Sequence, residues 1–313
     1  MAMTERPVQQ HNPQPYADIA AHITVTTKGG AGKTETADVL EAIYSLGGST
    51  CICVDIDDGN RGWHRRIGGD NIVKVDWTSG ASDAAPWLKR HAPSAGVMIF
   101  DLGAGISSSD TPVMAFLGAI WRLLHDGGAR LIFHCVVSTN APTARFVERI
   151  SATYGRLGEV VIVLNNKDGS GNFPEGLINL PVPHLKLSHS PPGVQAVRLS
   201  RVELLSAIIA KPTPDYTLAT GMMTARVHAF AKQLAKRGLV APEALFGLRS
   251  AAKRVPPLKI LIQRAQDATD ERIRQNANLR ATHDILTSEE LPQAELATVA
   301  RAYREAYAVW RGV

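Results

Sequence analysis

The sequence predicts a doubly wound α/β domain with a mostly parallel sheet, followed by a helical C-terminal extension. Short apolar runs alternate with amphipathic stretches along the 313-residue chain, and such strand–helix alternation builds sheets covered by helices. The runs are continuously apolar, as expected for parallel strands buried on both faces. A glycine-rich loop directly follows the first run. We expect strands at residues 22–26, 50–54, 97–100, 131–137 and 160–164.

Composition fits a globular protein and excludes several other classes. Apolar residues make up 45% of the chain and charged residues 20%, which is ordinary for a domain with a sizeable core. No apolar run reaches the ~18 residues of a membrane-spanning helix. Residues 1–20 lack the basic-then-apolar pattern of a secretory signal. Three cysteines are too few for a disulfide framework, so we expect a cytoplasmic protein with reduced thiols.

The chain divides into three parts. Residues 1–20 are rich in Pro and Gln without periodicity, and they predict a flexible N-terminal tail. Residues 21–255 hold the strand candidates and form the predicted α/β domain. Residues 256–313 begin at a Pro-Pro boundary, and their periodicity predicts a helical C-terminal extension.

Helices are expected between the strands and after the last of them. The clearest covers about residues 35–46, where apolar residues share one face and the two following glycines end the helix. After residue 192 the strand signal fades, and helical patterns follow near 194–210 and 219–238.

The strongest functional signal is T-T-K-G-G-A-G-K-T at residues 26–34, between the first strand and the first helix. Glycines let such a loop wrap so that backbone N–H groups converge on phosphate oxygens, and the helix N-terminus adds its positive dipole. Lys33 would bind the β- and γ-phosphates, and the Thr34 hydroxyl would ligate Mg²⁺. The predicted nucleotide contacts are Lys28, Gly29, Gly30, Ala31, Gly32, Lys33, Thr34 and Glu35.

The loop is unusual because Thr27 replaces the first glycine of the general pattern and a second lysine, Lys28, precedes the paired glycines. This K-G-G-x-G-K-T form resembles the deviant Walker A loop of the ParA/MinD family of ATPases, over about residues 21–240. The resemblance implies a homodimer when ATP is bound, in which Lys28 reaches the partner's nucleotide and neutralises phosphate charge as an arginine finger does. It also implies ATP and Mg²⁺ as cofactors.

Two strands end in aspartates at the positions that this resemblance requires. The V-D-I-D ending at Asp57 is similar to the family's D-x-D. This implies that Asp57 positions the attacking water and that Asp55 lies near the metal as a partner of the groups that bind it. The V-M-I-F-D ending at Asp101 is a Walker B pattern, so Asp101 would hold Mg²⁺ through water. Turn capping is the alternative role for such aspartates, and the phosphate loop makes it the weaker one. The expected metal site is Thr34, Asp57 and Asp101.

A base site is implied next to the phosphate loop. Residues 160–164 run into Asn165, similar to the family's strand whose terminal Asn reads the adenine edge. The following Pro181, Val182 and Pro183 resemble its adenine-flanking segment. A guanine-reading N-K-x-D starting at Asn166 is not present, because the spacer residue is missing. The pattern therefore favours ATP over GTP.

The chain departs from the family at two places. Glu35 stands where the family usually has a second Thr; a carboxylate there suits the helix dipole but repels phosphate, which predicts weak nucleotide affinity. In addition, D-D-G-N at residues 57–60 is shorter than the D-P-Q-G-N common in plasmid-partition members.

Positive charge is concentrated in one segment. The chain carries 34 basic and 29 acidic residues, net +5, whereas residues 198–254 hold ten Lys/Arg and three Asp/Glu, net +7. A basic helix face can bind DNA phosphates without reading sequence, and a solvated face is the alternative. The candidate DNA contacts, at spacings that can share one helical face, are Arg226, Lys232, Lys236 and Arg237.

The last predicted helix offers a competing interpretation. MinD-like relatives end in an amphipathic helix that lies on the membrane surface. Glutamates and small alanines in this helix instead favour packing on protein. Its apolar face consists of Leu296, Val299, Ala300, Tyr303, Tyr307 and Trp310.

Together these observations predict a slow, ATP-dependent dimerising ATPase that segregates or positions cargo, most consistent with plasmid or other DNA partition on the nucleoid. A cargo adaptor or an ATPase-stimulating protein is the expected partner. The first alternative is a MinD-like membrane or cell-pole positioning factor, or an accessory ATPase of conjugative transfer. The second is an ATP-dependent ligase or kinase on the same fold, for which the sequence offers no substrate-binding constellation.

Overall fold

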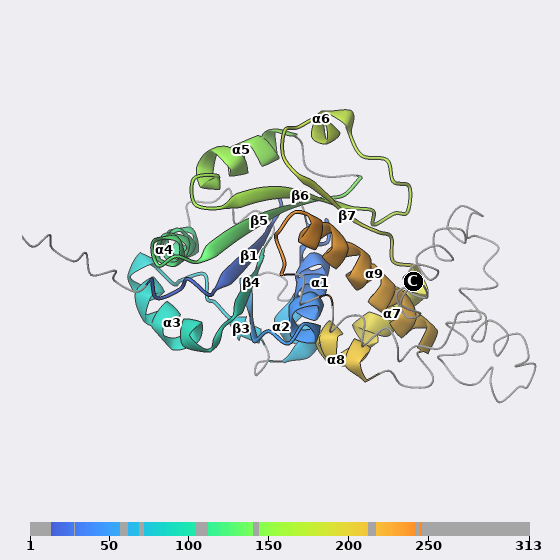
Figure 1. The fold of residues 1–313 in the computed structure, drawn as a ribbon, viewed down its shortest axis with the longest axis horizontal. Coiled ribbons are helices and arrows are strands. Elements are labelled where there is room, and N and C mark those ends of the chain that lie inside the picture. The colour runs from blue at the N-terminus through green and yellow to red at the C-terminus, as the bar shows by residue number, and fades with distance from the viewer. Residues whose placement is uncertain are drawn as a thin grey trace, which may run out of the picture.

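The computed structural model describes residues 14–27, 29–56, 62–68, 72–103, 112–139, 144–211, 217–241 and 245. Within them, seven strands form one all-parallel sheet in the order β3-β2-β4-β1-β5-β6-β7 (Figure 1). This confirms the doubly wound α/β fold. The strands are β1 (Ala20–Val25), β2 (Cys51–Ile56), β3 (Ile72–Lys74), β4 (Val97–Leu102), β5 (Arg130–Val137), β6 (Glu159–Asn165) and β7 (His184–Leu187).

All five predicted strands are present, and the two that the sequence did not predict lie at the sheet edges. β3 has three residues and β7 has four, so neither gives the continuous apolar run by which a buried strand is recognised. β7 also alternates between buried and exposed side chains, because an edge strand is covered less completely than a central one.

Helices cover both faces of the sheet and bury two separate apolar clusters (Figure 1). The first face carries α1 (Lys33–Leu46), α2 (Gly62–Ile67), α7 (Pro192–Ser200), α8 (Leu205–Ala210) and α9 (Thr217–Lys236). The second face carries α3 (Ala84–His91), flanked by 3₁₀ turns at Ala81–Asp83 and Ala92–Ser94, with α4 (Pro112–Asp126) and α5 (Ala144–Tyr154). The short α6 (Glu175–Ile178) precedes β7.

The central strand β1 decides where a ligand can bind. The chain leaves β1 for β2 on one side of the sheet and later crosses from β4 to β5 on the other, so β1 lies between β4 and β5. The connection after β1 therefore opens at the carboxyl edge of the sheet, at a topological switch point. Ligands of open α/β sheets bind at that position.

The domain boundaries are described only in part. β1 begins at Ala20, and the Tyr16 N–H donates to the Gly127 carbonyl at 2.8 Å, so the last residues of the predicted tail belong to the folded domain. The helical extension at 256–313, with the proposed membrane-binding face, lies outside the described residues. No helix in the described part of the chain is long and apolar enough to cross a membrane.

A buried polar chain crosses the first face from β5 to the end of α9. Tyr44 donates its hydroxyl proton to the Leu239 carbonyl at 3.1 Å, so the hydroxyl must accept from His22 Nε2 at 2.6 Å. His22 Nδ1 is then an acceptor, and His134 Nε2 is its donor at 2.8 Å. Both imidazoles are neutral, because burial lowers the pKa of His22 and brings that of His134 to about 3.

These histidines predict a loss of stability in acid. Because the folded pKa of each lies below the unfolded value of about 6.5, their contribution is complete above pH 6.5 and is lost as pH falls toward 3. Between pH 7 and pH 5, His134 alone would cost about 2 kcal/mol of unfolding free energy. His134→Gln keeps an N–H donor but does not titrate, so its denaturation midpoint should fall less over this range. His125→Gln, at an exposed site on α4, should keep the parental pH dependence.

Candidate functional site

The predicted phosphate loop joins β1 to α1 and requires its glycines. Gly30 and Gly32 have φ values of 77° and 96°, a left-handed conformation that is strained for other residues. A Cβ on Gly32 would also lie 1.9 Å from the Asn165 amide nitrogen. Gly32 is the N-cap of α1, and its carbonyl accepts the first helical hydrogen bond from Thr36 at 2.9 Å. Lys28 lies outside the described residues, so its role stays a prediction.

Lys33 and Thr34 are the first two residues of α1, and Thr34 contacts β4, the strand with the predicted Walker B pattern. The Thr34 hydroxyl donates to one Asp101 carboxylate oxygen at 2.6 Å, and Thr24 of β1 donates to the other at 3.1 Å. Burial raises the pKa of Asp101 to about 7, although the hydrogen bond from Thr34 and the charge of Lys33 oppose this. A hydroxyl and a carboxylate thus meet at the carboxyl ends of β1 and β4.

This pair fits Mg²⁺ bound together with a nucleotide. Mg²⁺ in phosphate-binding sites takes one or two protein oxygens and completes its shell with phosphates and water. Thr34 and Asp101 supply that type of donor, and the described residues include no cluster of three or more His, Cys, Asp or Glu that would make an all-protein metal site. The third predicted ligand, Asp57, lies outside the described residues.

Asp55 lies beside Asp101 and holds the start of α2. The two aspartates are paired residues in the register of β2 and β4. Asp55 is buried, and one of its carboxylate oxygens accepts from the His64 N–H at 2.8 Å. Its charge raises the pKa of Asp101 further, after the larger effect of burial. The two aspartates therefore form an acidic pair below the phosphate loop.

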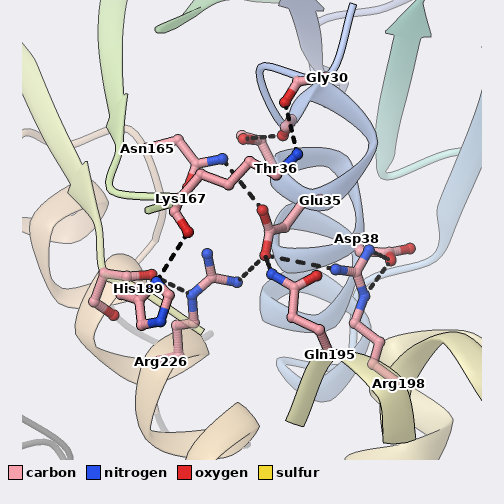
Figure 2. Close-up of polar contacts among 12 residues, drawn as sticks. Gly30, Glu35, Thr36, Asp38, Asn165, Lys167, His189, Gln195, Arg198 and Arg226 are labelled. Carbon is pink, nitrogen blue, oxygen red and sulfur yellow. Dashed lines mark hydrogen bonds and ion pairs between the residues drawn. The ribbon is translucent and has the colours of Figure 1, made fainter. Parts of the chain in front are cut away.

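Glu35 is paired with cations that the sequence did not connect to it (Figure 2). Its Oε1 lies 2.8 Å from Arg226 Nη1 of α9 and 3.6 Å from Arg198 Nη1 of α7, and it accepts from Gln195 at 3.1 Å. Burial alone would raise the pKa of Glu35, but Arg226 and Arg198 outweigh it and lower the pKa. Glu35 is therefore an ionised carboxylate.

A second buried acid of α1, Asp38, is also paired with arginines. Arg198 also pairs with Asp38, which accepts from Arg66 of α2 at 2.7 Å. The two acids are joined by three arginines, so the cluster carries a net charge of +1. These ion pairs offset the repulsion between Glu35 and phosphate that the sequence predicts, and the effect of Glu35 on nucleotide affinity stays a prediction. No local pattern could have found these partners, since Asp38 and Arg198 are 160 residues apart.

Arg226 is not part of the exposed basic surface on α9, which corrects the sequence prediction. Its guanidinium lies between Glu35 and the Ser188 carbonyl, to which Nε donates at 2.6 Å. Lys232, Lys236 and Arg237 are exposed, and Arg237 donates to the His184 carbonyl at 3.0 Å. The sequence prediction rested on spacings that can share one helical face, whereas a buried carboxylate on α1 pairs with Arg226 and holds it inward.

Asn165 ends β6 and lies directly against the phosphate loop. It is fully buried, and its amide nitrogen donates to the Ala31 carbonyl at 3.1 Å and to Glu35 Oε2 at 3.2 Å. Lys167, which the sequence did not single out, donates to the Gly30 carbonyl at 3.0 Å (Figure 2). Whether Asn165 also reads a base stays a prediction.

The sequence predicts that Pro181, Val182 and Pro183 flank a base next to the phosphate loop, but this segment lies at the opposite edge of the sheet. It precedes β7, and in a parallel sheet the residues before a strand lie at the amino edge, away from the phosphate loop. The segment beside Asn165 is instead residues 188–191, which follow β7. There His189 Nδ1 lies 2.9 Å from the Lys167 carbonyl. The sequence prediction missed this because it did not contain β7.

The strand order, the left-handed glycines and the Thr34–Asp101 contact define a P-loop nucleotide-binding α/β domain. Solved structures with a similar chain path include the MinC:MinD cell division complex of Aquifex aeolicus (TM-score 0.46, 15% identity, covering 71% of this chain and 98% of that one). The septum site-determining protein MinD of Pyrococcus horikoshii OT3 with Mg-ADP has a TM-score of 0.42 and 14% identity, covering 77% and 97%.

A third similar structure is the signal recognition particle 54 kDa protein of Aeropyrum pernix K1 with GDP, at a TM-score of 0.40 and 14% identity, covering 97% of this chain and 79% of that one. No protein-family profile matches the sequence, and no curated protein matches it. The fold assignment therefore rests on the strand order and the loop of this chain.

Arg226→Ala should destabilise the fold strongly. It leaves Glu35 buried without its nearest cation, and removing one partner of a buried ion pair costs about 3–5 kcal/mol. Lys232→Ala, an exposed cation on the same helix, should change the unfolding free energy by about 0.5 kcal/mol or less. Urea denaturation of both variants measures this. Equal stabilities would mean that Arg226 is not a structural cation, and Glu35→Gln added to Arg226→Ala should recover part of the loss.

Proposed function

We propose that the protein is an ATP-dependent switch ATPase that positions or segregates DNA. The observation that carries this proposal is the phosphate loop at the switch point, with Thr34 and the Walker B Asp101 in hydrogen-bond contact at 2.6 Å. A loop of this kind binds di- and triphosphates and has little other use. The ion pairs of Glu35 offset its repulsion of phosphate.

The roles of the described residues follow from their positions. The N–H groups of the loop and of the first turn of α1 would bind phosphate oxygens. Lys33 would neutralise the β- and γ-phosphates, while Thr34 and Asp101 would hold Mg²⁺. When bound, Mg²⁺ supplies positive charge that stabilises the phosphates during transfer. Asp101 must give up any proton it holds to act in this way.

The switch itself depends on residues that the resemblance assigns. Lys28 would reach the ATP of a partner subunit, which makes the homodimer conditional on ATP, and Asp57 would position the attacking water. Hydrolysis would then remove the γ-phosphate that holds the dimer together. A cargo adaptor or stimulating protein would set the rate of that step.

DNA is the cargo that the described surface favours. Lys232 and Lys236 are exposed in the last two turns of α9, and the exposed Arg237 directly follows the helix. Clustered cations neutralise backbone phosphates without sequence readout. The MinD-like alternative, a membrane-surface positioning factor, depends on residues 296–310, which lie outside the described chain. Vesicle binding by the full chain without DNA binding would favour that alternative.

Lys33→Ala should abolish nucleotide binding, because no other side chain replaces its charge at the β- and γ-phosphates. Calorimetric titration with Mg-ATP and with Mg-GTP measures this and tests the base preference in the same experiment, with ATP expected to bind more tightly. Lys89→Ala, at an exposed site on α3, should bind like the parent. Sedimentation of the parent with and without ATP tests the dimer. Unchanged ATP affinity in Lys33→Ala would refute the phosphate-loop assignment.

Replacing Lys232, Lys236 and Arg237 together by Ala should weaken DNA binding about equally for all sequences. Each lost phosphate contact should also flatten the plot of log affinity against log salt by about 0.9. A matched variant removes the same charge from the second face of the sheet: Lys89→Ala, Arg90→Ala and Arg122→Ala. If both triple variants lose the same affinity, net charge and not this surface binds DNA.

A further inference from the structure

Two side chains at the end of β6 hold consecutive carbonyl groups of the phosphate loop. Lys167 Nζ donates to the Gly30 carbonyl at 3.0 Å, and Asn165 Nδ2 donates to the Ala31 carbonyl at 3.1 Å (Figure 2). In a planar trans peptide, the carbonyl of one residue and the N–H of the next point in opposite directions. The N–H groups of Ala31 and Gly32 therefore point away from β6.

We propose that Lys167 and Asn165 are positioning residues that fix the orientation of these two peptides, so that the Ala31 and Gly32 N–H groups face the phosphates before ligand arrives. This inference rests on the proposed function, because it needs a nucleotide at the loop. It assigns to Lys167 a role that the sequence did not suggest. It also gives Asn165 a role toward the loop backbone, in addition to any contact with a base.

Fixing the two peptides matters because glycines flank them. Gly30 and Gly32 both have positive φ, and glycine adopts either sign of φ at similar energy. The Gly30–Ala31 and Ala31–Gly32 peptides could therefore rotate unless their carbonyls are held. A rotated peptide would present a carbonyl oxygen to the phosphates and replace an attractive contact by a repulsive one.

The Asn165 amide, which holds the Ala31 carbonyl, is itself fixed by Glu35. The second proton of the Asn165 amide goes to Glu35 Oε2 at 3.2 Å, and Arg226 and Arg198 hold that carboxylate. An ionised carboxylate can accept hydrogen bonds but cannot donate them. It therefore keeps the amide nitrogen of Asn165, and not the amide oxygen, on the side that faces Glu35 and the loop. Glu35, where the resemblance leads one to expect Thr, therefore braces the amide that orients the Ala31 carbonyl.

Lys167 is braced by the turn that follows β6. Its own N–H donates to the Asn165 carbonyl at 2.8 Å, and its carbonyl lies 2.9 Å from His189 Nδ1. The next residue, Asp168, contacts the Thr139 hydroxyl and accepts from the Ser170 N–H at 3.1 Å. The backbone of residues 165–170 is thus fixed against the segments that follow β5 and β7, although the Lys167 side chain itself is exposed.

The test uses Lys167→Met, which keeps the alkyl chain but removes the donor, in the full chain. Affinity for inorganic pyrophosphate and for Mg-ADP should fall by the same factor, about tenfold for the loss of a hydrogen bond from a charged donor. The ratio of ADP to GDP affinity should not change, because the effect acts on the phosphate loop. Lys167→Arg should restore both affinities, and Lys186→Met, at an exposed site on β7, should match the parent.

A second readout separates orientation of the peptide from a direct charge effect. In the ligand-free Lys167→Met variant, the Ala31 amide resonance should broaden or shift as the peptide samples both orientations, and Lys167→Arg should recover the parental signal. An unchanged Ala31 resonance, or a loss confined to the ADP-to-GDP ratio, would overturn the proposal. A parent that binds neither pyrophosphate nor ADP would instead overturn the proposed function itself.

Discussion

The site depends on one constraint: α1 buries an acidic face, and buried carboxylates need partners. Glu35, Asp38 and Glu41 are each at most 7% exposed, and an unpaired charge in such surroundings costs several kcal/mol or more. Arginines from α2, α7 and α9 form ion pairs with Glu35 and Asp38. Ser206 of α8 donates to Glu41, whose pKa burial raises to about 7. The helices of the first face are therefore fixed to the helix that begins at the phosphate loop.

The same constraint joins the phosphate loop to α9. Arg226 points inward to Glu35, while Lys232 and Lys236 lie exposed farther along the same helix and Arg237 directly follows it. One helix thus connects the first turn of α1 with the surface that we propose for DNA. Buried pairs of this kind favour one arrangement of the helices over others, since each misplaced arginine would leave a carboxylate unpaired.

Around the loop itself, polar contacts come from β4, one neighbour of β1, and from the end of β6. Asp101 of β4 meets Thr34, whereas Asn165 and Lys167 at the end of β6 hold the loop carbonyls. A parallel sheet makes this possible because the carboxyl ends of all its strands lie at one edge. Residues far apart in the chain thereby meet around a single ligand position.

The sequence by itself determined the central strands, the loop at residues 26–34, the helix after it and the aspartates at two strand ends. Each of these depends on contiguous residues, whose periodicity and glycine content are local properties. Only the tertiary structure decided which charges pair. Arg226, predicted on the basic surface, pairs with Glu35, and Lys167 donates to the Gly30 carbonyl. It also showed that Pro181 to Pro183 precede an edge strand too short to be recognised. The physical reason is that ion pairs and strand order join segments up to 191 residues apart, and no local pattern encodes them.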